Sequence, residues 1–362
     1  MANMELKFFG DVFRGKRILV TGHNGFKGSW LVLWLQMLGA EVYGLALAPA
    51  SPSHFHSLEL DVREKTIDIN DAKIVYEYVS KVSPEVVIHL AAQPLVRESY
   101  LDPINTWNTN VFGTLNVLEA VRKTRNIRAV ICITTDKVYR QSENQIAFME
   151  NAHLGGHDAY SASKAACEIL IDSHRASFFS AENAPLIASV RAGNVIGGGD
   201  WAKERIVPDL MRSAVTQLPV NIRYPQAIRP WQHVLDCLSG YLVIAKTLLD
   251  GNVSAARAWN IGPKSYERLT VQQIAERFSQ HFPAISWTIS EEPAPHEASF
   301  LSLNSSAIQK NLGWEPVLDL DRSIEITATW YRRFIEQGIV SSIDNINSYM
   351  QDARASGQVW AK

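Results

Sequence analysis

The chain has 362 residues, of which 46% are hydrophobic and 20% are charged, and its formal net charge is −2. This length can hold one large domain and a second lobe, and the small net charge gives no basis for binding nucleic acid or an anionic membrane. No apolar run approaches the roughly 18 residues of a membrane span, and the first residues lack the apolar core of a secretory signal. Cys132, Cys167 and Cys237 lie far apart, which predicts free, buried thiols rather than disulfides or a metal site. We therefore expect a cytoplasmic protein.

The first half of the chain alternates between short apolar runs and helical patterns. We expect buried strands near 18–20, 42–47, 86–91, 129–134 and 186–190, and helices over 28–38, 72–81, 104–123 and 158–178. This alternation predicts an α/β fold, with a doubly wound parallel sheet of the Rossmann type over residues 1–190. After 191 the pattern is less regular, and helices are expected over 206–217, 234–249 and 271–282. Residues 191–362 are interpreted mainly as a smaller C-terminal α/β substrate lobe, from which some segments could return to the sheet.

A glycine-punctuated turn, TGHNGFKG, follows the first expected strand. Its glycines suit a tight turn, a close approach to a pyrophosphate and close helix–strand packing, in that order. The following helix N-terminus offers N–H groups and a partial positive charge to phosphates. Lys27 either adds a cation beside the pyrophosphate or is a solvated lysine, and His23 is more typical of a polar loop. The segment predicts a dinucleotide site made by Gly22, His23, Asn24, Gly25, Phe26, Lys27 and Gly28.

Two acidic residues precede the helix expected at 72. Asp71 suits the helix cap, which leaves Asp68 to accept a hydrogen bond from adenine while Ile69 packs on the ring. The end of the second strand, at 47–50, has neither an acid for the ribose 2′-hydroxyl nor an arginine for a 2′-phosphate. This position therefore does not decide between NAD and NADP.

Tyr160 and Lys164 are spaced to lie on one face of the helix expected over 158–178. The Lys164 ammonium, aided by a positive nicotinamide, would lower the pKa of the phenol from about 10, so that Tyr160 can take a proton from a substrate hydroxyl. Lys164 should also hold the nicotinamide ribose. Thr134 or Thr135, at the end of the fifth strand, can hydrogen-bond the same substrate hydroxyl. Asn110 lies on a helix facing this site and is either a substrate contact or a helix-packing amide.

Several motifs spread over residues 21–316 carry a family resemblance. They are TGHNGFKG, HLAAQ (89–93), NTNVFGT (108–114), YSASK (160–164), RAGNVIGGGDWA (191–202), RPWQHV (229–234) and LGWEP (312–316). The chain resembles the extended short-chain dehydrogenase/reductases that act on nucleotide sugars, and its longest motifs are most similar to the CDP-glucose 4,6-dehydratases. The resemblance implies deoxysugar biosynthesis, for surface polysaccharide such as lipopolysaccharide O-antigen. It adds to the expected NAD contacts, together with Tyr160 and Lys164, the residues Leu90, Ala91, Ala92, Thr109 and Thr134.

Asp136 and Lys137 stand where relatives that only epimerise or reduce usually have small residues. The resemblance implies that they act after oxidation of a hexose at C4. Lys137 would remove the C5 hydrogen as a base, and Asp136 would protonate the departing C6 hydroxyl. These roles need an acid that is desolvated enough to stay protonated and an amine whose pKa is lowered. The alternative is a salt bridge between the two in a loop.

The expected substrate contacts lie on both sides of residue 191. Arginine side chains suit pyrophosphate oxygens, and Arg191 is a further candidate of this kind. His296 stands where the family often has a basic residue that contacts the substrate. The expected substrate contacts are Gln93, Asn110, Asn194, Arg205, Arg229 and His296.

The expected reaction is the NAD-dependent conversion of CDP-glucose to CDP-4-keto-6-deoxyglucose and water. NAD is expected because a couple that is recycled within the reaction has no need of NADP. The alternatives are a 4,6-dehydratase for a dTDP-, GDP- or UDP-sugar, a 4-epimerase, and a non-catalytic NAD-sensing regulator. The pair Asp136–Lys137 counts against an epimerase, and the presence of both Tyr160 and Lys164 counts against a regulator.

Assembly is expected from the helices over 104–123 and 158–178. Both carry more apolar residues than one face of a sheet needs. Extended relatives pair such helices into a four-helix bundle, so a homodimer or a dimer of dimers is expected.

Overall fold

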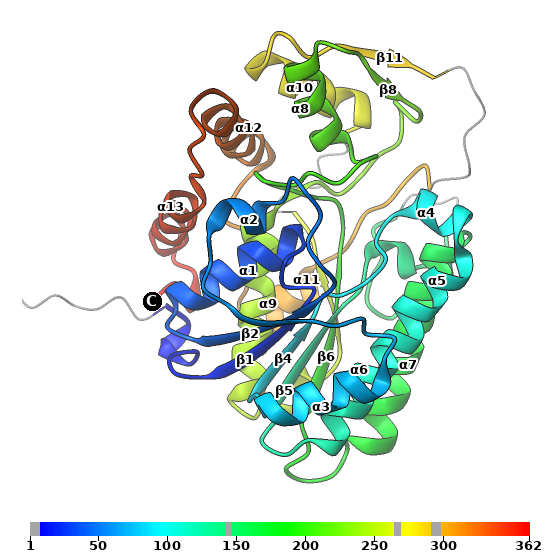
Figure 1. Ribbon diagram of the computed structural model, residues 1–362, viewed down its shortest axis with the longest axis vertical. Coiled ribbons are helices and arrows are strands. Elements are labelled where there is room, and N and C mark those ends of the chain that lie inside the picture. The colour runs from blue at the N-terminus through cyan, green and yellow to red at the C-terminus, as the bar shows by residue number, and fades with distance from the viewer. Residues whose placement is uncertain (1–7, 142–145, 264–268, 291–297) are drawn as a thin grey trace, which may run out of the picture.

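A seven-stranded parallel sheet lies at the centre of the protein (Figure 1), in the order β10-β6-β5-β4-β1-β2-β3. The computed structural model describes residues 8–141, 146–263, 269–290 and 298–362. Strand order reverses between β1 and β4, which is the switch point of a doubly wound sheet, and the predicted fold class is confirmed. The strands are β1 (Arg17–Thr21), β2 (Glu41–Ala46), β3 (Arg63–Thr66), β4 (Val86–His89), β5 (Ala129–Ile133), β6 (Leu186–Ala192) and β10 (Ala258–Ile261).

Helices cover both faces of this sheet. Successive residues of one strand enter two different hydrophobic cores, since Ile18 and Val20 belong to one cluster while Leu19 belongs to the other. Burial on both faces explains why the central strands read as continuous apolar runs. The first cluster holds α1 (Phe26–Met37) and α9 (Val234–Leu249), and the second holds α3 (Ala72–Val82), α6 (Gly113–Lys123) and α7 (Ala159–Phe178).

The helix expected over 104–123 is divided. It comprises α5 (Pro103–Trp107), a π-helical turn (Asn108–Phe112) and α6, and it follows α4 (Val96–Leu101). The edge strand β3 was not among the apolar runs, because each of its residues is exposed. Cys132, Cys167 and Cys237 are free and buried, as predicted. No helix within the described residues is long and apolar enough to span a membrane.

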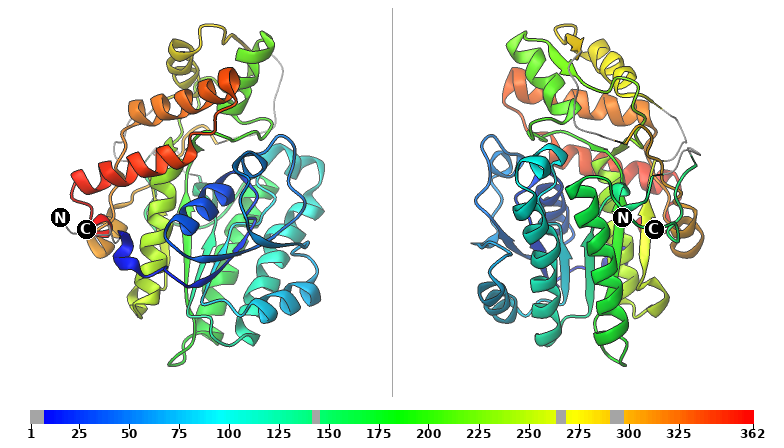
Figure 2. Two further views of the ribbon diagram at one scale, coloured as in Figure 1. Left: turned by 60° about the vertical axis from the view of Figure 1, so that its left-hand side comes forward. Right: turned by 90° about the vertical axis from the view of Figure 1, so that its right-hand side faces the viewer.

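A smaller group of elements lies beyond one end of the sheet (Figures 1 and 2). It contains α8 (Ile206–Thr216), α10 (Val271–His281) and the paired strands β8 (Val220–Ile222) and β11 (Trp287–Ile289). The chain returns from it to the sheet, because α9 packs on β5 and β6 and β10 pairs with β6. The helix at 234–249, expected in the substrate lobe, therefore packs on a face of the sheet.

The C-terminal helices join the two parts of the protein. Figure 2 shows α12 (Leu320–Gln337) and α13 (Ser342–Ala355), neither of which was predicted, along one side of the molecule. α12 contacts α10 and the short paired strands β7 (Val195–Ile196) and β9 (Gln232–His233), while α13 contacts α1. The remaining elements are α2 (His54–Leu58), α11 (Ser306–Leu312) and short 3₁₀ turns at Phe8–Asp11, Asp136–Val138, Val253–Ala255 and Val359–Ala361.

His54 links α1 to the C-terminal helices. Its Nδ1 lies 2.8 Å from Ser29 Oγ and its Nε2 lies 2.7 Å from Ser342 Oγ, while Trp30 stacks on the ring at 4.8 Å. Burial lowers the pKa of His54 from 6.5 to about 3. The ring is therefore neutral in the folded protein.

We predict that acid destabilises the protein through buried histidines. The pKa values of His54, His89 and His233 are each lowered from 6.5 to about 3, mainly by burial. As pH falls, these imidazoles are protonated in the unfolded chain before they are protonated in the folded protein. Their contribution to the unfolding free energy is therefore complete above pH 6.5 and is lost as pH falls toward 3. Removing one such ring by His54→Asn should flatten the pH dependence of the unfolding free energy by up to about 1.4 kcal/mol per pH unit. Denaturant unfolding across this window measures the slope.

The exposed neighbour His56 provides the control. His56→Asn should keep the slope of the parent protein. Equal slopes for His54→Asn and the parent would contradict the buried-histidine explanation.

Candidate active site

A pocket opens where the carboxyl ends of the central strands face the smaller group of elements. Its wall includes the start of α1, the ends of β4, β5 and β6, the start of α7, and parts of α8 and β8. This edge of a doubly wound sheet is where such folds bind ligands. The predicted site residues that line it are Phe26, Lys27, Leu90, Ala92, Thr134, Thr135, Asp136, Lys137, Tyr160, Lys164, Asn194, Arg205 and Arg229.

The glycine turn is packed too tightly for side chains. Gly22 has a φ of +68°, and a Cβ there would lie 2.8 Å from the backbone nitrogen of Ala91. A Cβ on Gly28 would lie 2.1 Å from the carbonyl oxygen of Gly22. Gly25 precedes α1 and supplies no side-chain cap to its first N–H groups. These features fit a dinucleotide, because a pyrophosphate can take the uncapped N–H groups at a helix N-terminus.

Lys27 is half-buried and is hydrogen-bonded to the protein. Its Nζ donates to the hydroxyl of Tyr241 on α9 at 3.1 Å and lies 5.7 Å from the centre of that ring. Burial lowers the pKa of Lys27. The alternative of a solvated lysine is therefore wrong, and the ammonium lines the pocket beside the glycine turn.

The polar residues of the same turn are engaged by the protein. His23 is buried, pairs with Glu64 of β3 and lies against Gly44 of β2. Asn24 donates to the carbonyl oxygen of Leu47 at 2.7 Å. Both side chains therefore fasten the turn to the neighbouring strands.

The proposed adenine contacts have different surroundings. Asp71 caps α3, as predicted, by accepting from the backbone nitrogen of Ile74 at 3.0 Å. Asp68 is exposed and accepts from the backbone of Asn70. Ile69, expected to pack on adenine, is instead a core residue packed against Gly113 of α6. Thr109 is half-buried and does not line the pocket among the described residues.

Tyr160 and Lys164 lie on the first turns of α7, which Asp158 caps by accepting from the backbone of Ser161 at 2.9 Å. Lys164 Nζ donates to the carbonyl oxygen of Ile133 at 3.3 Å, and burial lowers the pKa of this amine. Burial also raises the pKa of Tyr160 to about 12, although a hydrogen bond with Thr135 opposes the rise. The lowered phenol pKa expected from Lys164 is absent among the protein's own groups, because desolvation outweighs the neighbouring charges.

Asp136 and Lys137 lie on a 3₁₀ turn directly after β5. The Thr135 hydroxyl starts this turn by accepting from the Lys137 backbone, and it donates to Asp136 Oδ1 at 3.0 Å. Asp136 is 2% exposed, and its Oδ2 has no hydrogen-bond partner within the described part of the chain. Burial raises the pKa of Asp136, and the nearby ammonium of Lys137 opposes the rise.

This second pair adjoins the first. Lys137 Nζ lies 6.0 Å from the centre of the Tyr160 ring. Asp136 lines the same pocket as Tyr160, and its negative charge is among the causes that raise the pKa of Tyr160. An acid, an amine and a tyrosine–lysine pair thus meet in one pocket.

Thr134, which follows β5, and Arg191 of β6 both bind the buried carboxylate of Glu168. Thr134 donates its hydroxyl to Glu168 Oε1 at 2.5 Å, which leaves Thr135 as the threonine nearer Tyr160. Arg191, considered for the substrate nucleotide, forms a buried ion pair with Glu168 at 2.7 Å. The expectation for Arg191 is wrong because its charge is already paired in the core.

Gln93 and Asn110, expected at the substrate, are occupied by protein contacts. Gln93 accepts from the backbone of Leu95 at 2.6 Å and donates to the Thr106 hydroxyl at 2.8 Å. Asn110 accepts from the Gln93 backbone at 2.9 Å and donates to Ser163 Oγ at 2.9 Å. We correct both assignments to positioning roles, in which the amides tie the loop after β4 to α7.

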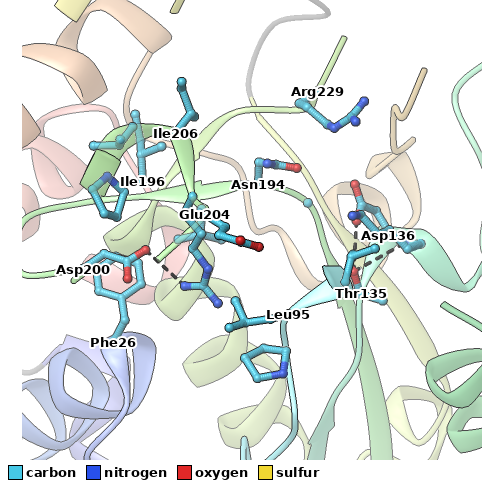
Figure 3. A pocket seen from close by; sticks show the side chains of 18 of the residues that line it. Phe26, Leu95, Thr135, Asp136, Asn194, Ile196, Asp200, Glu204, Ile206 and Arg229 are labelled. Atoms are coloured by element: carbon cyan, nitrogen blue, oxygen red, sulfur yellow. Dashed lines mark hydrogen bonds and ion pairs between the residues drawn. The ribbon is translucent and has the colours of Figure 1, made fainter. Parts of the chain in front are cut away.

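Asn194, Arg205 and Arg229 remain as substrate candidates at the pocket. A backbone hydrogen bond of 3.0 Å from Gln232 to the Asn194 carbonyl aligns the segments that carry Asn194 and Arg229. Figure 3 shows these two residues on the side of Asp136, across from Phe26 and Asp200. Arg205 donates to Asp200 at 3.1 Å. His296 lies outside the described residues.

Two features in and near the pocket were missed from sequence. Arg97 and Glu204 line the pocket and form an ion pair of 2.6 Å, although 107 positions separate them. No local pattern marks such a pair. Glu168, in contrast, follows Lys164 at helical spacing, so the repeat of Tyr160, Lys164 and Glu168 on one face was available as a signal.

Comparisons with known proteins agree with this geometry. Over 350 residues, the chain is 44% identical to a CDP-glucose 4,6-dehydratase of Salmonella typhimurium, covering 94% of this chain and 98% of the relative. It is 27% identical to a dTDP-glucose 4,6-dehydratase of Haemophilus influenzae, covering 87% and 97%. Among solved structures, a dTDP-glucose 4,6-dehydratase of Streptomyces venezuelae with bound NAD shares the fold, with a TM-score of 0.75, 20% identity and coverage of 88% and 97%.

A model of the GDP-mannose 4,6 dehydratase family matches residues 19–327, which is more than half of the chain. The match spans the glycine turn, both acid/base pairs and most of the smaller group of elements. The chain therefore belongs to the GDP-mannose 4,6 dehydratase family of extended short-chain dehydrogenase/reductases.

Proposed function

We propose that the protein is a hydro-lyase that converts CDP-glucose to CDP-4-keto-6-deoxyglucose and water. The position of Asp136 and Lys137 beside Tyr160 carries this proposal, because it puts a second acid/base pair at a site built for oxidising a hydroxyl. The relative of 44% identity bears the name of this activity. Because that name specifies CDP-glucose, we prefer a CDP-sugar over other nucleotide sugars as the substrate.

NAD is the proposed cofactor. The uncapped start of α1 and the ammonium of Lys27 would hold its pyrophosphate, and Lys164 would hold the nicotinamide ribose. Leu90 and Ala92 line the pocket beside this path. The chemistry that NAD supplies here is storage of one hydride, taken from C4 of the hexose and given back at C6.

Oxidation at C4 begins with Tyr160. Its phenolate takes the proton of the C4 hydroxyl, while Thr135 holds the same oxygen by a hydrogen bond. Since burial is the main cause that raises the pKa of Tyr160 to about 12, the positive charges of Lys164 and of the nicotinamide have to offset desolvation. Lys164 lies one helical turn from Tyr160 and supplies the permanent part of this charge.

Elimination then uses the second pair. The C4 ketone acidifies the C5 hydrogen, which Lys137 removes as a neutral amine. Asp136 gives its proton to the C6 oxygen, and water leaves. After hydride reaches C6, Lys137 returns a proton to C5, and the proton held by Tyr160 replaces the one lost by Asp136. A raised pKa of Asp136 keeps this carboxyl protonated for its step.

The proposed substrate phosphates lie near the arginines. Arg205, Arg229 and Asn194 line the same pocket as Asp136. Asp200 holds Arg205 in place, which reduces the entropy lost when phosphate binds. Guanidinium groups suit pyrophosphate because they donate two parallel hydrogen bonds.

A panel of nucleotide sugars tests the activity. The protein with NAD should convert CDP-glucose faster than the dTDP-, GDP- and UDP-sugars, as measured by the alkaline absorbance of a 4-keto-6-deoxy sugar. Because hydride is returned, no net reduced nicotinamide should form, and NAD should bind more tightly than NADP. Stoichiometric reduced nicotinamide would indicate a dehydrogenase, and a C4-inverted sugar would indicate an epimerase.

We predict that three substitutions stop the reaction at different steps. Tyr160→Phe should prevent C4 oxidation, so no enzyme-bound reduced nicotinamide appears. Lys137→Ala should allow oxidation but slow exchange of the C5 hydrogen with solvent. Asp136→Asn should leave that exchange measurable and impair loss of the C6 hydroxyl. Each should lower turnover by about 10²–10⁴-fold, since general acid–base groups contribute on this scale. Absorbance and deuterium incorporation distinguish the steps.

Matched variants control for unspecific damage. Tyr78 is another tyrosine whose pKa burial raises to about 12, but it lies on α3 and donates to the Arg63 backbone. Tyr78→Phe and the exposed Lys73→Ala should keep full turnover. Near-normal turnover of both Lys137→Ala and Asp136→Asn would reduce that pair to a structural role and remove the main support for a dehydratase.

We further propose a homodimer, or a dimer of two such dimers, formed through α4, α5 and α7. These helices contact one another and carry large apolar side chains that are exposed in one chain. Burial of such side chains in a second copy would stabilise the assembly. They are Leu101, Ile104, Trp107, Phe112 and Ile169.

We predict that charge on this surface separates the copies. Ile104→Glu and Ile169→Glu should each give a monomer by light scattering at micromolar concentration, because a buried carboxylate without a partner is costly. Val253 is also exposed and apolar but lies on the turn after α9, so Val253→Glu should leave the dimer intact. A monomeric parent protein would contradict the assembly.

Two further features of the proposal concern cellular context. Free, buried Cys132, Cys167 and Cys237 support a reducing compartment, for which we propose the cytoplasm. The proposed product is a deoxysugar precursor, and we propose surface polysaccharide as its destination.

A further inference from the structure

A buried ion pair lies beneath the turn that carries Asp136 and Lys137. Glu168 is on α7, one turn beyond Lys164, and Arg191 is on β6. The Arg191 Nη2 to Glu168 Oε2 distance is 2.7 Å, and the two side chains are 5% and 2% exposed. Neither group lines the pocket, so the pair cannot touch the proposed substrate.

The carboxylate of this pair holds the start of the catalytic turn. Glu168 accepts from Thr134 Oγ1 at 2.5 Å and from Ser189 Oγ at 2.8 Å. Thr134 directly precedes Thr135, Asp136 and Lys137 in the chain. Ser189 lies on β6 and belongs to no part of the proposed catalytic turn.

The guanidinium holds the end of the same turn. Arg191 donates to the hydroxyl of Tyr139 at 2.8 Å and lies 5.0 Å from the centre of that ring. Tyr139 in turn donates to Asn260 Oδ1 of β10 at 2.6 Å. Burial raises the pKa of Tyr139 to about 12, so the phenol stays protonated and can donate while it accepts from Arg191. Tyr139 follows Val138, the last residue of the turn.

The two members of one ion pair are therefore hydrogen-bonded to the residues on either side of the turn, Glu168 to Thr134 and Arg191 to Tyr139. We propose that the Glu168–Arg191 pair positions the turn at 135–138 for elimination, with Thr134 and Tyr139 as the two points of attachment. Tyr160 and Lys164 need this attachment less, because α7 carries them directly. This inference rests on the proposed function, since it assigns the pair to one step of that reaction.

An ion pair suits this positioning role because of its hydrogen bonds rather than because of its contribution to stability. A buried ion pair costs desolvation and often gives little net stability over an apolar replacement. Its charged hydrogen bonds are strong and directional, however, and they fix neighbouring hydroxyls more firmly than neutral groups would. Misplacement of a catalytic group by about 1 Å can cost 10²-fold in rate. A rigid attachment at both ends is therefore valuable where an acid and a base must act on adjacent carbons.

The test removes one attachment at a time and leaves the ion pair in place. Thr134→Val and Tyr139→Phe should each lower turnover of CDP-glucose by about 10–10²-fold. KM should stay within about twofold of the parent protein, and the rate of C4 oxidation in a single turnover should fall less than the rate of elimination, since Asp136 and Lys137 act only in elimination. Reduced nicotinamide should accumulate during the reaction, and Thr134→Ser should restore turnover because it keeps the hydroxyl.

Ser189→Ala is the matched control, because it removes the third hydrogen bond to the same carboxylate without touching the turn. It should lower the melting temperature about as much as Thr134→Val and leave turnover unchanged. If Ser189→Ala slows turnover as much as the two attachment variants, or if all steps slow together, the pair is merely structural and the inference fails.

A second readout does not depend on the substrate. Amide hydrogen exchange of residues 135–139 should be faster in Thr134→Val and Tyr139→Phe than in the parent protein, and unchanged in Ser189→Ala. Equal exchange in all three variants would overturn the inference even if the parent protein rejected CDP-glucose. Failure of the parent protein with every sugar, together with the expected exchange pattern, would instead reject the proposed function alone.

Discussion

Desolvation of ionisable groups at the carboxyl edge of the sheet sets the chemistry of this protein. The same burial that raises the pKa of Asp136 lowers that of Lys164 and raises that of Tyr160. Each shift favours the neutral form, which suits an acid held ready but works against a tyrosine that must ionise. The pocket therefore needs cations close to the phenol. In the proposed mechanism this charge comes from Lys164, one helical turn from Tyr160 on α7, and from the nicotinamide.

The central strands and the cap of α3 were predictable from sequence, because each depends on residues that are close together in the chain. Apolar runs predicted five of the central strands, and Asp71 was correctly placed as a helix cap. Elements without such a pattern were missed. The strand at 63–66 is polar because it forms the sheet edge, and α12 and α13 expose much of their surface. Their packing depends on partners far away in sequence.

At the site, residue type indicated which side chains could take part in a reaction, but it did not indicate whether a side chain contacts the ligand or the protein. Asp136, Lys137, Tyr160 and Lys164 do line one pocket, and their roles remain proposals. Gln93, Asn110 and Arg191 have groups suited to a ligand, yet the protein's own backbone and side chains engage them. Sequence cannot distinguish these cases, because a buried polar group needs a partner whether that partner is substrate or protein.

The return of the chain to the sheet after the smaller group of elements affects how the protein can fold during synthesis. β10 completes the sheet edge beside β6, and α9 covers the face of β5 and β6, although both follow β6 by dozens of residues. A nascent chain that ended near residue 190 would leave the apolar surface of β5 and β6 open to water or to other chains. Residues 1–190 therefore do not form a complete core by themselves, and we expect this core to close only after residues through 261 have been synthesised.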